Sequence, residues 1–109
     1  MAFSELLAKR VRQALAPLCR FQEKKMFGGL GFFVNGNMAC GVYKDHMIVR
    51  VGSEKYEALL KEPFAKVFDI TGRAMTGWIM VDIRGLESDE VIEFWAKKGV
   101  DFVSGLPAK

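Results

Sequence analysis

The stretch that decides the fold is residues 26–51, MFGGLGFFVNGNMACGVYKDHMIVRV. Three apolar runs alternate there with two short polar turns, a pattern typical of consecutive strands. Residues 26–34, 38–43 and 47–51 are therefore predicted strands, the first of them apolar on both faces and rich in glycine. Asn35-Gly36 is a strong hairpin signal, because both residues tolerate positive φ. The stretch predicts a three-stranded antiparallel meander.

The periodicity changes on both sides of this meander. Before it, residues 3–19 place apolar side chains at three- and four-residue steps, which predicts an amphipathic helix. After it, a short helix is predicted to begin with Ser53 as its N-cap and to end before Pro63, since the residue that precedes a proline is disfavoured in a helix. The remaining predicted elements are strands at 66–70 and 77–83 and a helix from Ser88 to Gly105, with Gly99 as a candidate interruption.

The predicted order is α-β(3)-α-β(2)-α, which places the chain in the α+β class. An antiparallel sheet packed on helices gives a two-layer architecture. With 109 residues the chain has the length of one domain, and residues 1–109 are expected to form it. An apolar fraction of 50% is that of an ordinary globular protein, so the core needs neither disulfides nor a metal.

The net charge of +3 is small, but it is distributed unevenly. Residues 1–25 hold six basic and two acidic side chains, whereas the rest of the chain holds ten basic and eleven acidic ones. A basic segment can suit nucleic acid or an acidic partner, although it is more often a solvated helix face. Direct nucleic-acid binding is therefore an alternative interpretation, which rests on Lys9, Arg12, Arg20, Lys24 and Lys25.

Several sequence features bear on location. The two cysteines lie in apolar surroundings without a CxxC pair, which is typical of a reduced intracellular protein. The first residues lack the basic start and apolar run of a secretory leader. The apolar runs are too short to cross a bilayer. The expected location is the cytoplasm, with no membrane partner.

Few side chains could carry catalysis or bind a metal. His46 is the only histidine and falls in a predicted turn, so a solvated residue is expected rather than a general base. Cys40 alternates with apolar residues and is expected in the core. The glycines of 27–31 lie inside a strand, which predicts a bulge or close backbone approach rather than a phosphate-binding loop. The sequence predicts no enzyme, no cofactor and no metal site.

One charged residue interrupts the third strand of the meander. Arg50 is expected on a partly open face of the sheet, beside Trp78 or Tyr43. An arginine among aromatic rings suits an anion, a nucleic acid or an acidic peptide. A structural ion pair of Arg50 with Asp69 or Asp82 is the plainer alternative.

The candidate interaction surface combines basic residues with one tryptophan. A small-molecule or anion site centred on Arg50 and Arg73 is a further alternative to protein binding. The full candidate surface consists of Lys9, Arg12, Lys24, Lys25, Arg50, Arg73 and Trp78.

Five segments, in order along the chain, carry a family resemblance. They are 24–32 (KKMFGGLGF), 35–42 (NGNMACGV), 47–51 (MIVRV), 69–78 (DITGRAMTGW) and 99–103 (GVDFV). Together they resemble the N-terminal domain of the TfoX/Sxy family, which has a similar K-M-F-G-G segment followed by a hairpin and an M-x-x-G-V-like strand. The resemblance covers nearly the whole chain.

The resemblance implies a two-layer fold similar to type III secretion chaperones. It also implies a regulatory or protein-interaction domain without catalytic residues. The best-known family members regulate natural competence with a cyclic-AMP-receptor-type activator at promoters, so a protein partner such as a transcription factor is expected. Those members carry a second, C-terminal domain, which the 109 residues are not expected to include. Pairing of two copies is an open alternative, because an exposed Phe94 would suit an interface.

Overall fold

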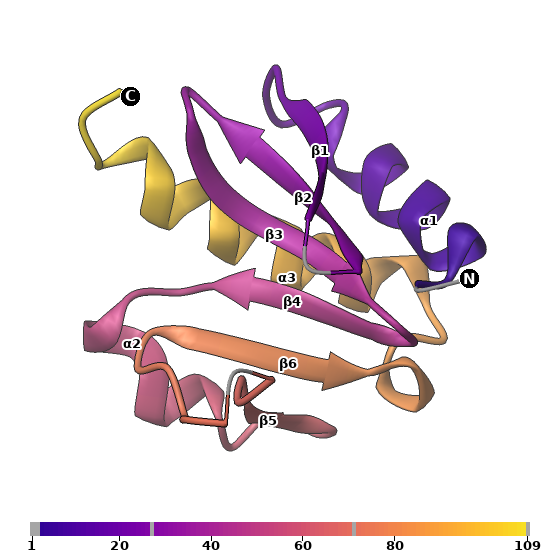
Figure 1. The fold of residues 1–109 in the computed structure, drawn as a ribbon, viewed down its shortest axis with the longest axis vertical. Coiled ribbons are helices and arrows are strands. Elements are labelled where there is room, and N and C mark those ends of the chain that lie inside the picture. Colours follow the sequence, from indigo (N-terminus) through magenta and orange to yellow (C-terminus); the bar gives the residue numbers. More distant parts are fainter. Residues whose placement is uncertain (1–2, 27, 71, 109) are drawn as a thin grey trace.

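The sheet contains six strands in the order β1-β2-β3-β4-β6-β5, and every neighbouring pair is antiparallel. The computed structural model describes residues 3–26, 28–70 and 72–108. Helices α1 and α3 lie behind the sheet, and α2 lies near its β5–β6 side (Figure 1). The elements are α1 (Glu5–Leu15), β1 (Gln22–Met26), β2 (Gly29–Val34), β3 (Asn37–Tyr43), β4 (His46–Arg50), α2 (Ser53–Leu59), β5 (Ala65–Val67), β6 (Trp78–Asp82), the 3-10 turn η1 (Ile83–Gly85) and α3 (Asp89–Ser104).

The predicted α+β class is confirmed, and the order of elements follows the prediction with one strand added. The predicted strand over 26–34 is in fact the end of one strand and the whole of the next. β1 and β2 form a hairpin, and Gly28 has a φ of 75° in the connection between them. A positive φ of this size is readily adopted only by glycine, so the chain reverses there instead of continuing. Phe27 lies outside the described residues.

The ends of two helices differ from the sequence prediction. α1 begins after Ser4, whose hydroxyl accepts the Leu7 N–H at 3.1 Å, and it ends at Leu15 rather than at residue 19. α2 begins at Ser53, but the residue at its N-cap is Gly52, with a φ of 83° and no side-chain cap. Ser53 is therefore the first helical residue, and the prediction that it caps the helix is wrong.

α3 is one continuous helix. Ser88 is its N-cap, as predicted, and the Ser88 hydroxyl accepts the Val91 N–H at 3.2 Å. Gly99 does not interrupt the helix. A Cβ added at Gly99 would lie 2.4 Å from the Ala39 carbonyl oxygen, so this glycine lets α3 approach β3 closely.

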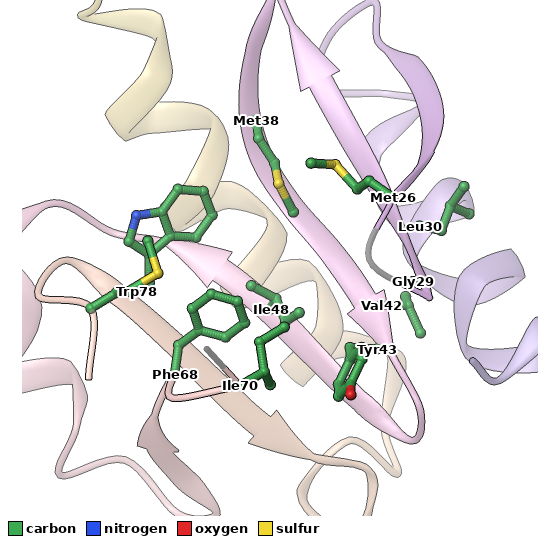
Figure 2. A pocket seen from close by; sticks show the side chains of 11 residues that line it. Met26, Gly29, Leu30, Met38, Val42, Tyr43, Ile48, Phe68, Ile70 and Trp78 are labelled. Carbon is green, nitrogen blue, oxygen red and sulfur yellow. The ribbon is translucent and has the colours of Figure 1, made fainter. Parts of the chain in front are cut away.

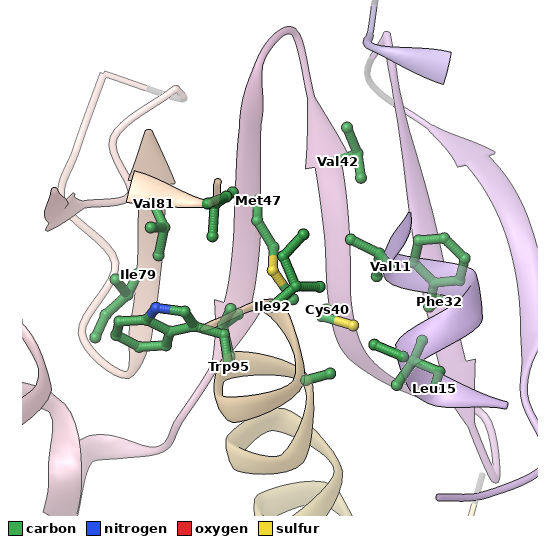
Figure 3. Packing of buried hydrophobic residues seen from close by; sticks show 14 of the residues in the cluster. Val11, Leu15, Phe32, Cys40, Val42, Met47, Ile79, Val81, Ile92 and Trp95 are labelled. Carbon is green, nitrogen blue, oxygen red and sulfur yellow. The ribbon is translucent and has the colours of Figure 1, made fainter. Parts of the chain in front are cut away.

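The main core lies between the sheet and the helices α1 and α3. Alternate residues of the central strands point into it, because successive side chains of a strand face opposite sides. Figure 3 shows Trp95 and Ile92 of α3 reaching toward the strand side chains, with Val11 and Leu15 of α1 beside Phe32. The strand residues of this core include Leu30, Phe32, Cys40, Val42, Met47, Val49, Ile79 and Val81.

Candidate functional site

The opposite face of the sheet, called here the outer face, is the one turned away from α1 and α3. One row of paired residues crosses it from strand to strand, and it places a lysine at each end with glycine and apolar residues between. The row is Lys24, Gly31, Gly41, Ile48, Met80 and Lys66. A chain segment between β5 and β6 covers part of this face, since Phe68, Ile70 and Met75 pack against Ile48 and Met80.

An apolar groove of about 390 Å³ opens on the outer face. Met26 and Met38 lie on one side of it, and Trp78, Phe68 and Ile70 lie on the other (Figure 2). A volume in this range is typical of ligand-binding hollows. Among the described residues, the lining consists of Met26, Gly29, Leu30, Met38, Val42, Tyr43, Ile48, Phe68, Ile70, Met75 and Trp78.

Glycines on β2 and β3 leave the floor of this groove without side chains. A Cβ added at Gly29 or Gly41 would lie 2.6 Å from a carbonyl oxygen of the neighbouring strand, so the two strands are too close for a side chain there. A Cβ at Gly31 would meet the Met26 sulfur at 3.1 Å and a Phe33 ring carbon at 2.9 Å. The space that side chains would fill is thus left to flexible methionine and to the groove.

The predicted interaction surface is divided between the two faces. On the helix side lie the exposed Lys9 of α1, together with Arg12 and Lys25, which shares the face of Leu30. Lys24 shares the outer face with Gly31. The other outer-face members are Arg50 and Trp78, while Arg73 is exposed in the segment that connects β5 to β6.

Arg12 is engaged within the protein. Its Nη2 donates to the Glu23 Oε1 at 2.7 Å, and its Nε donates to the other carboxylate oxygen. The hydrogen bond from Arg12 lowers the pKa of the Glu23 carboxyl below its ordinary value. This pair links α1 to β1. Because the Glu23 carboxylate accepts both hydrogen bonds, the charge of Arg12 is largely neutralised.

Arg50 lies beside Trp78, as predicted, and not beside a carboxylate. The two residues are paired across β4 and β6, and the guanidinium carbon lies 5.3 Å from the Trp78 ring centre. It lies 5.4 Å from the Phe102 ring centre as well. The predicted alternative partner Asp82 accepts instead from the Arg84 Nε at 3.0 Å. Arg50 is therefore held by two aromatic rings and keeps its hydrogen-bond donors for another group.

His46 is the residue that the sequence describes least well. It begins β4 rather than sitting in the turn, and its side chain is only 14% exposed, so the prediction of a solvated residue is wrong. Its ring nitrogens lie 3.2 Å from Asp45 and 3.7 Å from Asp82, with no hydrogen-bond partner in the described structure. Burial lowers the pKa of the imidazole, and the charge of Lys66 acts in the same direction.

The remaining sequence predictions about chemistry concern cysteine, metals and membranes. Cys40 is fully buried in the core, as predicted, and burial raises the pKa of its thiol far above the ordinary value. Within residues 3–26, 28–70 and 72–108, no three His, Cys, Asp or Glu side chains are placed to hold a metal ion. No helix in that part of the chain is long and apolar enough to span a bilayer.

The groove itself was not predicted from the sequence. Its lining combines residues from β1 to β4 with residues some thirty positions further along the chain, and only the fold brings these together. The available signal was the set of glycines at 29, 31 and 41 in predicted strands that also contain Met26 and Met38. Glycines on one face of a strand leave a hollow there.

Comparison with known proteins adds one finding. The model of the family described as the TfoX N-terminal domain matches residues 13–103. No curated protein and no solved structure matches the chain significantly. The matched range includes every residue that lines the groove.

Proposed function

Because the chain belongs to the TfoX N-terminal domain family, we propose that it is a non-enzymatic regulatory domain that binds a protein partner at the groove on its outer face. Family membership supports a regulatory or interaction role in general. The finer proposal, that the partner is a transcription factor, rests on the family resemblance of the sequence.

The observation that carries this proposal is the composition of the groove. The side chains that line it in the described part of the chain are apolar apart from the Tyr43 hydroxyl and the Trp78 indole N–H, and they include neither a carboxylate nor an imidazole. Catalysis by proton transfer or nucleophilic attack needs such groups in the site. An open apolar hollow with flexible methionines is instead typical of surfaces that accept side chains of a partner.

The placement of the basic residues within 1–25 disfavours direct nucleic-acid binding through that segment. Affinity for a phosphate backbone requires several free cations on one surface. Here Arg12 is paired with Glu23, and Lys24 faces away from Lys25. A titration with duplex DNA at low salt tests this alternative, and we expect no binding that weakens steeply as salt is added.

Site-specific photo-crosslinking in living cells tests the proposed function. One variant carries a photo-reactive residue in place of Met38, which lines the groove, and the control carries it in place of Leu6, which is 68% exposed on α1. We expect a discrete protein adduct from position 38 that mass spectrometry identifies as the same protein in repeated experiments. A partner that crosslinks only from position 6, or no adduct from either position, would contradict binding at the groove.

A further inference from the structure

The groove is surrounded by cations that have no carboxylate partner. Lys24, Lys44 and Arg50 each lie over an aromatic ring, with 5.6 Å from the Lys24 Nζ to the Phe33 centre and 5.5 Å from the Lys44 Nζ to the Tyr43 centre. In the part of the chain that the structure describes, none of the three forms an ion pair. A ring holds a cation in place through its face, so the donors stay available to an incoming anion.

Some basic side chains away from the groove are paired with carboxylates instead. Arg10 binds Asp89, and the guanidinium of Arg84 binds Asp82. Lys97 binds Asp101 on α3. The three cations beside the groove thus have no internal carboxylate, as is also true of exposed lysines such as Lys9 and Lys66 in the described part of the chain, and the exposed Asp69 on the covering segment pairs with none of the three.

The spacing of these cations indicates the size of the ligand. Lys24 is level with Ile48 but three strands away, which amounts to about 14 Å at the usual strand separation. Lys44 lies in the turn before β4 and Arg50 is the last residue of that strand, whose length from His46 to Arg50 is also about 14 Å. A ligand with a single anionic head can reach one cation, whereas a helix of about ten residues spans the same distance with several carboxylates.

We infer that the groove binds an acidic amphipathic helix of the partner, whose apolar side chains enter between Met26, Met38 and Trp78 while its carboxylates meet Lys24, Lys44 and Arg50. This inference rests on the proposed function and names the chemistry of the partner. A helix with its side chains is about 10 Å wide, so it fits within the roughly 14 Å that separate β1 from β4. A second copy docked face to face would bring the same cations together, so charge disfavours it.

Two synthetic peptides test the inference. Each has about 16 residues, enough for partial helix formation, with leucine and phenylalanine at helical spacing on one face. The first carries glutamate beside that face, and the second carries lysine at the same positions. By fluorescence anisotropy we expect the glutamate peptide to bind about 10-fold more tightly or better, with affinity that falls as salt is added.

Single substitutions test where the glutamate peptide binds on the protein. Lys24→Gln and Arg50→Gln are each expected to weaken the glutamate peptide about 3-fold, in the range measured for single exposed charge pairs. Lys9→Gln, on the helix side, is the matched control and leaves the affinity unchanged. Unfolding midpoints of all three variants are measured, so that any loss of fold is separated from loss of binding.

The two proposals fail in different ways. Equal affinity for the two peptides, or a loss in Lys9→Gln as large as in Lys24→Gln, overturns the acidic-helix inference. Displacement of the glutamate peptide by millimolar decanoate at the same affinity as the peptide overturns it as well, because one carboxylate would then suffice. If a protein still crosslinks from position 38 in that event, the proposed function stands. If position 38 yields no adduct, the proposed function falls.

Discussion

The two faces of the sheet are built from the same strands but differ in how far their side chains are buried. On the helix side, Phe32, Val49 and Ile79 are fully buried against α1 and α3. On the outer face, glycines and partly exposed residues alternate with them along the same strands, and Ile48 and Met80 are covered by Phe68. One face therefore stabilises the fold, and the other leaves apolar surface open, where we propose that a partner binds.

A pair of tryptophans gives the largest expected difference between the faces. Trp95 is 1% exposed in the core, and removal of a buried aromatic side chain typically costs about 3–5 kcal/mol. Trp78 is partly exposed on the outer face. Trp95→Ala should therefore lower the free energy of unfolding in urea by about 3–5 kcal/mol, and Trp78→Ala by less than about 2 kcal/mol.

Equal losses in the two tryptophan variants would show that the outer face contributes to stability as much as the core does. Trp78→Ala should also remove the glutamate peptide's affinity, since Trp78 lines the groove. Peptide binding by Trp95→Ala is measured without denaturant, where the variant remains folded.

Two glycines provide the next comparison. Gly99→Ala places a Cβ 2.4 Å from the backbone oxygen of Ala39, so α3 must move away from β3. We expect a net loss of about 1–3 kcal/mol even after the gain in helix propensity. Gly31→Ala meets only the far ends of the Met26 and Phe33 side chains, which can shift, so it should cost less than about 1 kcal/mol. Urea unfolding of both variants measures the difference.

A larger loss in Gly31→Ala than in Gly99→Ala would contradict this assignment. It would mean that the methionines over the glycines are fixed in place, and that the groove cannot adapt to a partner. The expected result leaves the groove adaptable and the α3–β3 contact rigid.

Local signals in the sequence predicted the helix-side face well. Strong alternation located the central strands, and the Ser88 hydroxyl capped α3 as predicted. β1 was missed because Gln22–Met26 is mostly charged, without alternation, and is held as an edge strand by its pairing to β2. Backbone pairing of this kind leaves no apolar pattern to detect.

The outer face was harder to predict because its features depend on distant segments. Arg50 beside Trp78 could be predicted, since each residue lies in a strand of clear alternation. The groove could not, because it forms only when Phe68 and Met75 fold back over β4 and β6. The burial of His46 likewise depends on its pairing with Asp82 across two strands.

The pH dependence of stability offers a finer probe of the outer face. Burial lowers the pKa of His46 below that of the unfolded chain, although Asp45 and Asp82 act against this, and Lys44 and Lys66 act with it. The folded protein then binds its proton less readily than the unfolded chain does. The contribution of His46 to the free energy of unfolding is therefore fully present above the unfolded pKa of about 6.5. It declines as the pH falls through 6.5 toward the folded pKa.

Unfolding in urea at pH 7.5 and at pH 5.5 measures this decline, which should be absent in His46→Gln. Asp82 does not interfere in this window, because Arg84 lowers the pKa of its carboxyl to about 2 and an unfolded aspartate titrates at about 4. The pKa of Glu23 is lowered as well. A decline that persists in His46→Gln would assign the pH dependence to another group.

The solvent side of α3 belongs to neither face and should contribute least. Glu93 lies four residues before Lys97, at the spacing of a helical ion pair, but in the structure the Lys97 Nζ lies 3.3 Å from the Asp101 Oδ2. Both partners are at least half exposed, and an exposed pair four residues apart in a helix is worth about 0.3–0.5 kcal/mol. Asp101 lies near the end of the helix, where the helix dipole disfavours a negative charge and offsets part of this gain.

A double-mutant cycle of Lys97→Gln with Asp101→Asn should therefore give a coupling of about 0.3 kcal/mol that disappears in high salt, and the cycle with Glu93→Gln should give none. A coupling to Glu93 as large as that to Asp101 would support a Glu93–Lys97 pair as well, and it would show that Lys97 exchanges between its two neighbours in solution.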